Sequence, residues 1–588
     1  MLSTRMRQAA AGAGSAIAYL FRVSFSTPDA TPVTSPYAGE VGSVTVADVS
    51  SLLSIADGEA IVASGGTTNS PNLVSTASMA RAKGRLVSLK STNGNAGGLL
   101  LGWSSGAAGT TYTHRLNPTT GTSLRTLPNF AVVGTLINDA VYWFCVILRA
   151  TGAYYFVRGG NYGYWCLVWV ENTDTSANLY PAWSNFGSVG KRMDDFVVPD
   201  VLWWPDAQAS DSFTRSNGAL GTSNDYEGGS AAAWTSALGT GEVISNAAGF
   251  TALSGGVGIA IIEGNDTDVT LTAALTWGAG NVGIVFRYVD TNNYIRAYHD
   301  GTRLKIDKVV AGSVTAVVSD VFAYAAGAHL VITANKTDIR ITYNNGQITV
   351  GGTISDAALQ TGTKVGIYST DTGNRVDNFA VWAFGTSGEY NALKGYAQIT
   401  SPKTYLACDG DSLTQGQSVA TSYPYQLADL LGRATHDYCN YGVSGQSALQ
   451  CAADASYTID PLASSFTDPI CIAWMGTNDI VGGASQATTY NAIVSYCQAR
   501  RTAGYRAVVL TILPRSAFDP TKEAIRVAVN ADIVANYATF ADGLVDVAAD
   551  SRLDDFNDTT YFLGDKTHLT TAGYAVVAGL AQTVINAM

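Results

Sequence analysis

Charged residues are scarce in this chain, and the signals of several protein classes are missing. Only 14% of its 588 residues are charged, and the net charge is −12. A protein this acidic is a poor partner for the negatively charged backbone of a nucleic acid. No apolar run reaches the roughly 18 residues that a membrane-spanning helix needs, so we expect no membrane span. Glycine, serine, threonine and aromatic residues are abundant, which is typical of β-rich modules that are extracellular or lie on a virion surface.

Cysteine and histidine are also rare. The seven cysteines are an odd number without a dense framework, so the sequence does not predict a disulfide-stapled protein. We expect Cys408 and Cys471 to be buried thiols in core strands, whereas Cys439 and Cys451 could form one bridge. The chain has no CxxC or HExxH motif and only five histidines, so nothing indicates a catalytic metal or another cofactor.

A chain of this length is too long for one core, and its composition changes along its length. We predict an N-terminal arm or helix at 1–28, a first β-sandwich at 29–200, a second β-sandwich at 206–385, a linker at 386–402 and a catalytic domain at 403–588. The arm would pack against a partner or another copy of the chain. Arg5 and Arg7 ahead of the apolar residues 9–21 also resemble the start of a signal peptide, which stays the alternative.

Residues 29–385 contain short runs of alternating apolar residues, separated by Gly, Asn, Thr and Asp. Many short strands with turn signals between them predict antiparallel β-sandwiches or jelly rolls. The stretch is also a divergent internal repeat. Residues 190–198 match 373–381 at an offset of 183 (373 − 190), Gly58-Glu59 match Gly241-Glu242 at 183 (241 − 58), and residues 98–103 match 283–288 at 185 (283 − 98). We therefore expect two tandem sandwiches.

The last third of the chain has a different pattern of apolar residues. Nearly continuous apolar runs, each about the length of a strand, alternate with helical patterns. The expected strands lie at about 404–408, 436–441, 469–475, 507–513 and 543–548, and the expected helices near 425–431, 487–503, 521–539 and 571–586. Such alternation predicts an α/β domain of three layers, in which a parallel sheet carries helices on both faces.

Four short motifs follow the ends of these strands. Gly410-Asp411-Ser412 comes where the first strand gives way to a turn, and Gly445 lies in the loop after the second strand. Asn478 follows the third strand, and Asp565 precedes His568 by three residues before the final helix. Carboxyl ends of parallel strands meet at one edge of a sheet, so these residues are expected to converge. Asp411 and Asp479 are interpreted as residues that cap helices or hold loops.

The four motifs resemble those of the SGNH (GDSL-type) esterase and lipase family. The resemblance covers roughly residues 404–588 and implies that Ser412 is the nucleophile and His568 the general base. It implies that Asp565 orients the imidazole. The oxyanion hole would consist of the N–H groups of Ser412 and Gly445 and the side-chain amide of Asn478. The spacing Asn-x-x-x-x-Gly, counted from Asn440, points to Gly445 rather than Gly442. These roles agree with the chemistry of ester cleavage, in which a hydroxyl needs a base and the developing oxyanion needs fixed donors.

The second sandwich loosely resembles concanavalin-like, laminin-G-like jelly rolls, and the first does so more loosely. The cues are residues 211–215, 283–288 and 375–379. The resemblance implies carbohydrate binding, sometimes with structural calcium, for which Asp266, Asp268 or Asp377 could supply ligands. One dense aromatic cluster could stack on sugars or, as we favour, fill a core or interface: Tyr154, Tyr155, Tyr162, Tyr164 and Trp165.

These features together predict a serine esterase that removes short, acetyl-type acyl groups from a carbohydrate polymer held by the sandwiches. The alternatives are a lipase or thioesterase acting on long acyl chains, and a phage tail or receptor-binding protein. In the latter, a homotrimer would use its domains for adhesion, with or without deacetylation. A glycosidase is a weaker alternative, since no pair of acids stands out in the sandwiches.

Overall fold

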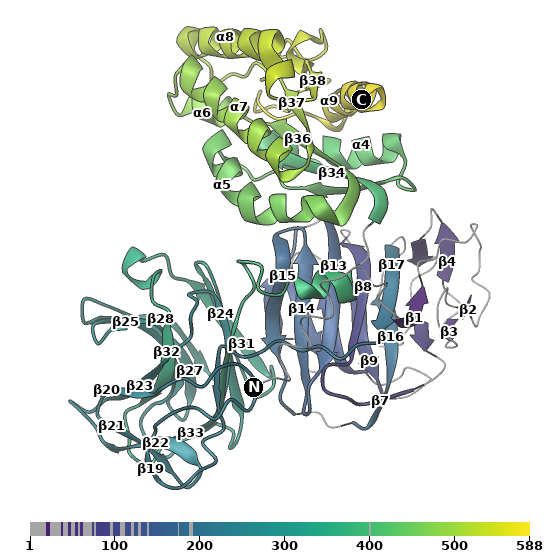
Figure 1. Ribbon diagram of the computed structural model, residues 1–588. Helices are drawn as coiled ribbons and strands as arrows, with labels where there is room; N and C mark the ends of the chain where they lie inside the picture. Colours follow the sequence, from purple (N-terminus) through teal and green to yellow (C-terminus); the bar gives the residue numbers. More distant parts are fainter. Residues whose placement is uncertain are drawn as a thin grey trace.

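The structure, a computed structural model, has three folded parts in chain order: two β-sandwiches and a C-terminal α/β domain (Figure 1). It describes residues 78–398 and 401–588, except 94–97, 106–111, 119–122, 128–130, 138–139, 174–175 and 187–191, and before residue 78 only six strands, β1 to β6. Of the predicted arm at 1–28, only residues 19–23 are described, and they form β1; the rest lies outside the described residues. No helix among the described residues is long and apolar enough to cross a membrane.

The first sandwich consists of two antiparallel sheets. One sheet contains β1 (Tyr19–Val23), β4 (Leu53–Ala56), β5 (Glu59–Val62), β8 (Leu86–Asn93), β13 (Ala140–Leu148), β14 (Ala153–Gly159), β15 (Tyr162–Val170) and β17 (Arg192–Pro199). The other contains β2 (Tyr37–Ala38), β3 (Thr45–Asp48), β6 (Leu73–Ser75), β7 (Met79–Ala80), β9 (Gly98–Ser104), β10 (Tyr112–Pro118), β11 (Ser123–Leu127), β12 (Val132–Thr135) and β16 (Asn178–Phe186). Their strand orders are β15-β14-β13-β8-β17-β5-β4, with β1 on β17, and β12-β11-β10-β9-β16-β6-β3-β2, with β7 on β16.

The second sandwich is built in the same way. Its first sheet contains β18 (Ala209–Asp211), β19 (Gly218–Ala219), β21 (Thr240–Ile244), β22 (Ala247–Ala252), β24 (Val269–Thr276), β29 (His329–Asn335), β30 (Asp338–Tyr343), β31 (Ile348–Thr353) and β33 (Arg375–Ala383). Its second sheet contains β20 (Thr235–Leu238), β23 (Gly258–Glu263), β25 (Val282–Asp290), β26 (Asn293–His299), β27 (Arg303–Val310), β28 (Ser313–Val321) and β32 (Lys364–Ser369), and a short helical turn, η1 (Ala357–Leu359), lies between β31 and β32. The orders are β19-β21-β22-β33-β24-β29-β30-β31, with β18 on β33, and β20-β23-β32-β25-β26-β27-β28.

The two sandwiches share one topology, as the internal repeat predicts. The path β17-β8-β13-β14-β15 corresponds to β33-β24-β29-β30-β31, and β16-β9-β10-β11-β12 corresponds to β32-β25-β26-β27-β28. Two of the three sequence matches join equivalent strands, β17 with β33 and β9 with β25. The third is wrong, because Glu59 lies in β5, which pairs with β17, whereas Glu242 lies in β21, which is separated from β33 by β22. A match of two residues carries too little information to fix a register.

Aromatic and charged side chains join the two sandwiches. The ring of Tyr154 lies edge-on to that of Trp382, with centroids 5.6 Å apart, and its hydroxyl donates to Glu227 at 2.8 Å. Glu227 also forms a buried ion pair with Arg149 at 2.5 Å. The predicted aromatic cluster is therefore core and interface rather than an exposed sugar platform, and Tyr164 is its half-buried member.

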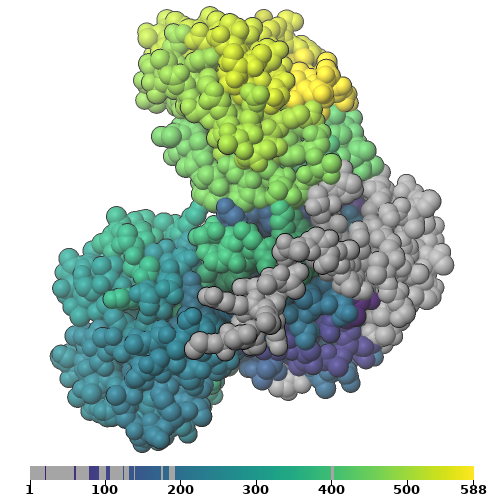
Figure 2. Space-filling model, in the orientation of Figure 1, coloured from purple at the N-terminus to yellow at the C-terminus, as the bar shows by residue number. Residues whose placement is uncertain are grey.

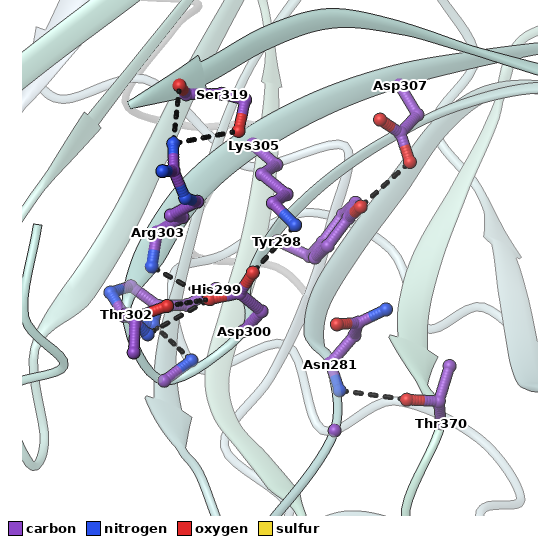
Figure 3. A network of polar contacts seen from close by, with 12 residues as sticks. Asn281, Tyr298, His299, Asp300, Thr302, Arg303, Lys305, Asp307, Ser319 and Thr370 are labelled. Carbon is purple, nitrogen blue, oxygen red and sulfur yellow. Dashed lines mark hydrogen bonds and ion pairs between the residues drawn. The ribbon is translucent and has the colours of Figure 1, made fainter. Parts of the chain in front are cut away.

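Acidic side chains of the second sandwich bind groups of the protein itself. Asp300 accepts the N–H groups of Thr302 and Arg303 and pairs with Lys305 at 2.6 Å (Figure 3). Of the residues considered for calcium, Asp268 pairs with the guanidinium of Arg287 at 3.0 Å. Within the described residues, no group of three or more His, Cys, Asp or Glu side chains could hold a metal ion.

The C-terminal domain is built on a parallel sheet. Its strands are β34 (Ser401–Gly410), β35 (His436–Asn440), β36 (Phe466–Trp474), β37 (Arg506–Leu510) and β38 (Gly543–Val545), in the order β35-β34-β36-β37-β38. The helices are α2 (Ala392–Ala397), α3 (Ser412–Gln415), α4 (Tyr423–Leu431), α5 (Ala448–Thr458), α6 (Thr477–Val481), α7 (Gln486–Ala503), α8 (Pro520–Asn536) and α9 (Thr571–Ala587), with short turns η2 (Asp460–Ser465), η3 (Tyr537–Thr539) and η4 (Val547–Ala549). The predicted three-layer α/β architecture is confirmed.

The C-terminal domain packs directly against the first sandwich (Figure 2). Phe466 stacks on Tyr405 at 4.1 Å and touches Trp143 of the sandwich, with ring centroids 5.5 Å apart. Lys90 of the sandwich forms a buried ion pair with Asp437 at 2.7 Å. The predicted linker carries α2, whose Leu393 is fully buried. All seven cysteines are free and buried, so the bridge between Cys439 and Cys451 is not formed.

Candidate active site

The nucleophile candidate, Ser412, lies where β34, an inner strand of the parallel sheet, ends. β34 runs to Gly410, and α3 begins at Ser412 with Asp411 as its N-cap. The Asp411 carboxylate accepts the N–H of Leu413 at 2.9 Å, which fixes the turn. Only glycine fits at position 410, because a Cβ there would lie 2.0 Å from the carbonyl oxygen of Trp474. β35 and β36 flank β34, so the loops that follow all three strands converge here.

Ser412, His568 and Asp565 form one hydrogen-bonded chain. His568 Nε2 lies 2.7 Å from Ser412 Oγ, and His568 Nδ1 lies 2.6 Å from Asp565 Oδ2. The other oxygen of Asp565 accepts the backbone N–H groups of Thr567 and His568 at 3.0 and 2.9 Å. A carboxylate on Nδ1 favours the tautomer whose Nε2 accepts the serine proton.

The environment keeps Asp565 ionised. Partial burial raises the pKa of this carboxyl, but hydrogen bonds from His568 and Thr567 outweigh it, so the pKa lies below its usual value. An ionised carboxylate next to the imidazole stabilises the imidazolium cation that forms when the ring takes up a proton.

Hydrogen-bond donors surround Ser412. The backbone N–H groups of Ser412 and Gly445 have no acceptor among the described residues. The side-chain amide of Asn478 donates one N–H to the carbonyl oxygen of Gln446 at 3.0 Å, which leaves its second N–H available. Ser444 N–H donates to the side chain of Gln415 in α3 at 3.1 Å, so the loop with Gly445 is tied to the turn that carries Ser412.

The two glycines of this loop differ in what surrounds them. A Cβ at Gly442 would lie 2.2 Å from the backbone nitrogen of Gln415, so this glycine allows close packing against α3. Gly445 is exposed, has φ +83°, and would have no atom within 4 Å of a Cβ. The open N–H of Gly445 can donate to a ligand, whereas the N–H of Gly442 already donates to Asn440 Oδ1 at 3.0 Å. The geometry thus favours Gly445 as the donor.

Three of the five predicted site residues, Ser412, His568 and Asp565, share hydrogen bonds. The other two, Gly445 and Asn478, belong to or bind the loop that is tied to α3 through Ser444. His436 is not part of the group, because it begins β35 and therefore lies at the opposite edge of the sheet. Asp479 accepts the N–H of Ala448 at 3.0 Å and so anchors the start of α5, as expected.

Sequence reasoning missed two residues beside the site. The carbonyl of Gln446 orients Asn478, a backbone role that leaves no residue-type signal. Arg515 donates to Thr477 at 3.2 Å, and its charge lowers the pKa of Asp411, although burial outweighs it. Its position a few residues beyond the strand that ends at Leu510 was a signal that could have identified it.

Parts of the chain are similar to known proteins. Residues 408–576 match the model of the GDSL-like lipase/acylhydrolase family. Among solved structures, the chain is similar to a member of the lipolytic protein G-D-S-L family from Veillonella parvula, with 18% identity, coverage of 32% of this chain and 100% of that chain, and a TM-score of 0.27. A family 3 carbohydrate esterase from Clostridium thermocellum gives 18% identity, 32% and 96% coverage and a TM-score of 0.26.

A third similar structure matches a different kind of protein. The carbohydrate binding module CBM66 from Bacillus subtilis is 17% identical, covers 26% of this chain and 95% of that chain, and has a TM-score of 0.23. No curated protein matches the sequence.

Proposed function

Because residues 408–576 form a GDSL-like lipase/acylhydrolase domain, we propose that the protein is a serine esterase that cleaves carboxylic esters through an acyl-serine intermediate. The observation that carries this proposal is the chain of contacts from Ser412 Oγ to His568 Nε2 (2.7 Å) and from His568 Nδ1 to Asp565 (2.6 Å). No step of the reaction needs a cofactor, since the base, the nucleophile and the oxyanion donors all come from the chain.

The first half of the reaction forms the acyl-enzyme. Ser412 Oγ attacks the ester carbon while His568 Nε2 takes the hydroxyl proton, and the carbonyl electron pair moves onto oxygen. The N–H groups of Ser412 and Gly445 and the amide of Asn478 donate to that oxyanion, and each such donor contributes roughly 3–4 kcal/mol. The intermediate then collapses, the C–O bond of the ester breaks, and the imidazolium protonates the departing alcohol.

The second half reverses these roles with water. His568 takes a proton from water as it attacks the acyl-serine carbon, and the same donors hold the second oxyanion. Collapse breaks the bond to Ser412 Oγ, which regains its proton from His568, and the carboxylic acid leaves.

We further propose that the substrate is a short, acetyl-type ester on a carbohydrate polymer, outside the cell or on a virion surface. Two sandwiches attached to the catalytic domain support this, since binding modules raise the local concentration of a polymer. On a virion, the protein would act as a homotrimer.

The test compares wild type with Ser412→Ala on p-nitrophenyl esters from acetyl to palmitoyl. The proposal predicts a preference for acetyl and a loss of roughly three or more orders of magnitude in kcat/KM for the variant. A preference for long acyl chains would instead indicate a lipase or a thioesterase. Full activity in Ser412→Ala would refute the serine mechanism.

A further inference from the structure

A cavity of about 330 Å³ lies where all three folded parts of the chain meet. The first sandwich contributes residues 161–164 and Cys166, and the second contributes residues 335–338. The C-terminal domain contributes residues 440–443, 454–455 and 457–458, among others. A volume of this size is in the range of small-molecule sites, and such sites are frequent at domain interfaces.

The cavity wall offers polar groups that the protein does not use. Tyr164 and Asn335 line the cavity and are half-buried, and the hydroxyl of Tyr164 and the carboxamide of Asn335 make no hydrogen bond with any described residue. Lys336 has no carboxylate within ion-pair distance among the described residues, and its ammonium lies over the ring of Tyr457. These hydroxyl, amide and ammonium groups can therefore form hydrogen bonds with a ligand.

Acceptors and aromatic rings complete the lining. Asp454 accepts hydrogen bonds from the Gln446 amide at 2.6 Å and from the Tyr457 hydroxyl at 2.5 Å. The rings of Tyr162 and Tyr441 add apolar faces. Donors, acceptors and tyrosine rings in one small space suit a molecule with many hydroxyl groups on a partly apolar ring, which is the chemistry of a sugar.

The cavity shares its wall with the catalytic machinery. Asn440 lines the cavity and donates to the carbonyl of Thr414 in α3 at 3.0 Å. Gln446 also lines it, and its carbonyl oxygen holds the amide of Asn478. Gly442 lines it while packing against the backbone of Gln415. One loop therefore separates the cavity from the oxyanion donors.

We propose that this cavity is a substrate subsite that binds one or two sugar residues of the carbohydrate chain, away from the reacting ester. The proposal rests on the esterase function proposed above and adds that both sandwiches contact substrate at the junction itself. Binding energy gained at a remote subsite can be used to orient the ester at Ser412.

The first test measures binding with Ser412→Ala protein, so that no turnover is needed. Partially acetylated oligosaccharides of xylose, glucose, mannose and N-acetylglucosamine serve as probes in isothermal titration calorimetry. The subsite predicts that at least one probe binds, and that adding Tyr164→Phe and Asn335→Ala weakens its Kd roughly tenfold, as expected for the loss of two hydrogen bonds. Absence of binding by all four probes, or an unchanged Kd, overturns the subsite.

The second test uses active enzyme with Tyr164→Phe and Asn335→Ala combined. We expect kcat/KM to fall roughly tenfold on the bound oligosaccharide and to stay within about twofold on p-nitrophenyl acetate. Tyr425→Phe with Asn292→Ala is the matched control, because both side chains lie outside the cavity lining and lack side-chain hydrogen bonds. Equal losses on both substrates contradict the subsite but leave the esterase intact, whereas no hydrolysis of p-nitrophenyl acetate by wild type refutes the esterase alone.

Discussion

Asp409 and Asp411, the two aspartates on either side of Gly410, are buried, and burial raises the pKa of each carboxyl. Burial raises the pKa of Asp409 to about 7 against the effect of a hydrogen bond from Tyr496. Burial likewise raises the pKa of Asp411 to about 7, and one of its oxygens has no hydrogen-bond partner among the described residues. Both groups thus favour the neutral acid in the folded protein.

These pKa values predict that the contribution of the two aspartates to stability falls as the pH rises from about 4 to about 7. In that window the folded protein binds more protons than the unfolded chain, whose aspartates titrate near pH 4. Asp409→Asn should remove about one proton from this difference, so the slope of unfolding free energy against pH should flatten by about 1.4 kcal/mol per pH unit. Urea unfolding at several pH values measures the slope.

The matched control for this substitution is Asp554→Asn, which alters an exposed carboxylate of the same domain. It should leave the slope as in wild type. If Asp409→Asn also leaves the slope unchanged, Asp409 is ionised in the folded state and the assignment of its pKa is wrong.

At the residue scale, sequence reasoning was strongest where side-chain type carries the chemistry. Ser412 and Asn478 follow the ends of β34 and β36, and Asp565 and His568 lie in the loop before α9 that reaches Ser412. It was weakest where the backbone acts, as with the carbonyl of Gln446, because any residue type supplies a carbonyl.

At the scale of elements, the loop 441–447 between β35 and α5 connects the nucleophile turn, the oxyanion donors and the cavity. Sequence patterns predicted β35 but not α5, whose small and polar residues between Ala448 and Thr458 give only a weak apolar stripe. A capping box at Ser447 and Gln450 sets the start of this helix. Four-residue helices such as α3 are too short for periodicity to reveal.

The packing of this loop predicts a strong effect for Gly442→Ala. The added Cβ would fall 2.2 Å from the nitrogen of Gln415, so the loop must move away from α3 and carry the donors with it. We expect kcat on p-nitrophenyl acetate to fall roughly tenfold or more, with a smaller change in KM, because oxyanion donors act mainly in the transition state.

Gly483→Ala separates loop displacement from simple backbone strain. Gly483 has φ +90° but no atom within 4 Å of a Cβ, so the alanine is strained without a clash. It should lower thermal stability while kcat stays near that of wild type. Equal kcat for Gly442→Ala and wild type would show that the loop does not hold the donors.

At the scale of the whole molecule, the catalytic domain and first sandwich form one packed body. Their shared contacts include the Lys90–Asp437 ion pair, with Glu59 and Asp194 also close to Lys90. Burial alone would lower the pKa of Lys90, but these carboxylates raise it well above its usual value. The sequence predicted separate domains but not this interface, because contacts between distant segments leave no local pattern.

The ion pair predicts that unfolding of the two parts is coupled. Lys90→Ala would remove the closer of the two cations at the buried Asp437 and leave only Lys403, 3.9 Å away, so we expect a loss of up to about 3–5 kcal/mol. Differential scanning calorimetry should show the transitions of the first sandwich and the catalytic domain shifting down together. Arg552→Ala, which removes an exposed ion pair with Asp550 of the catalytic domain, is the control and should shift Tm little. A shift confined to the sandwich would contradict a common body.

The central claim is that Ser412 is made nucleophilic by His568, and active-site labelling tests it most directly. The protein is treated with a fluorophosphonate, and the adduct is mapped by peptide mass spectrometry. We predict one adduct, on Ser412, that is absent in Ser412→Ala and forms at least 100-fold more slowly in His568→Ala, as removal of a triad base implies. An adduct on another residue, or labelling of Ser412 at an unchanged rate in His568→Ala, would contradict the account.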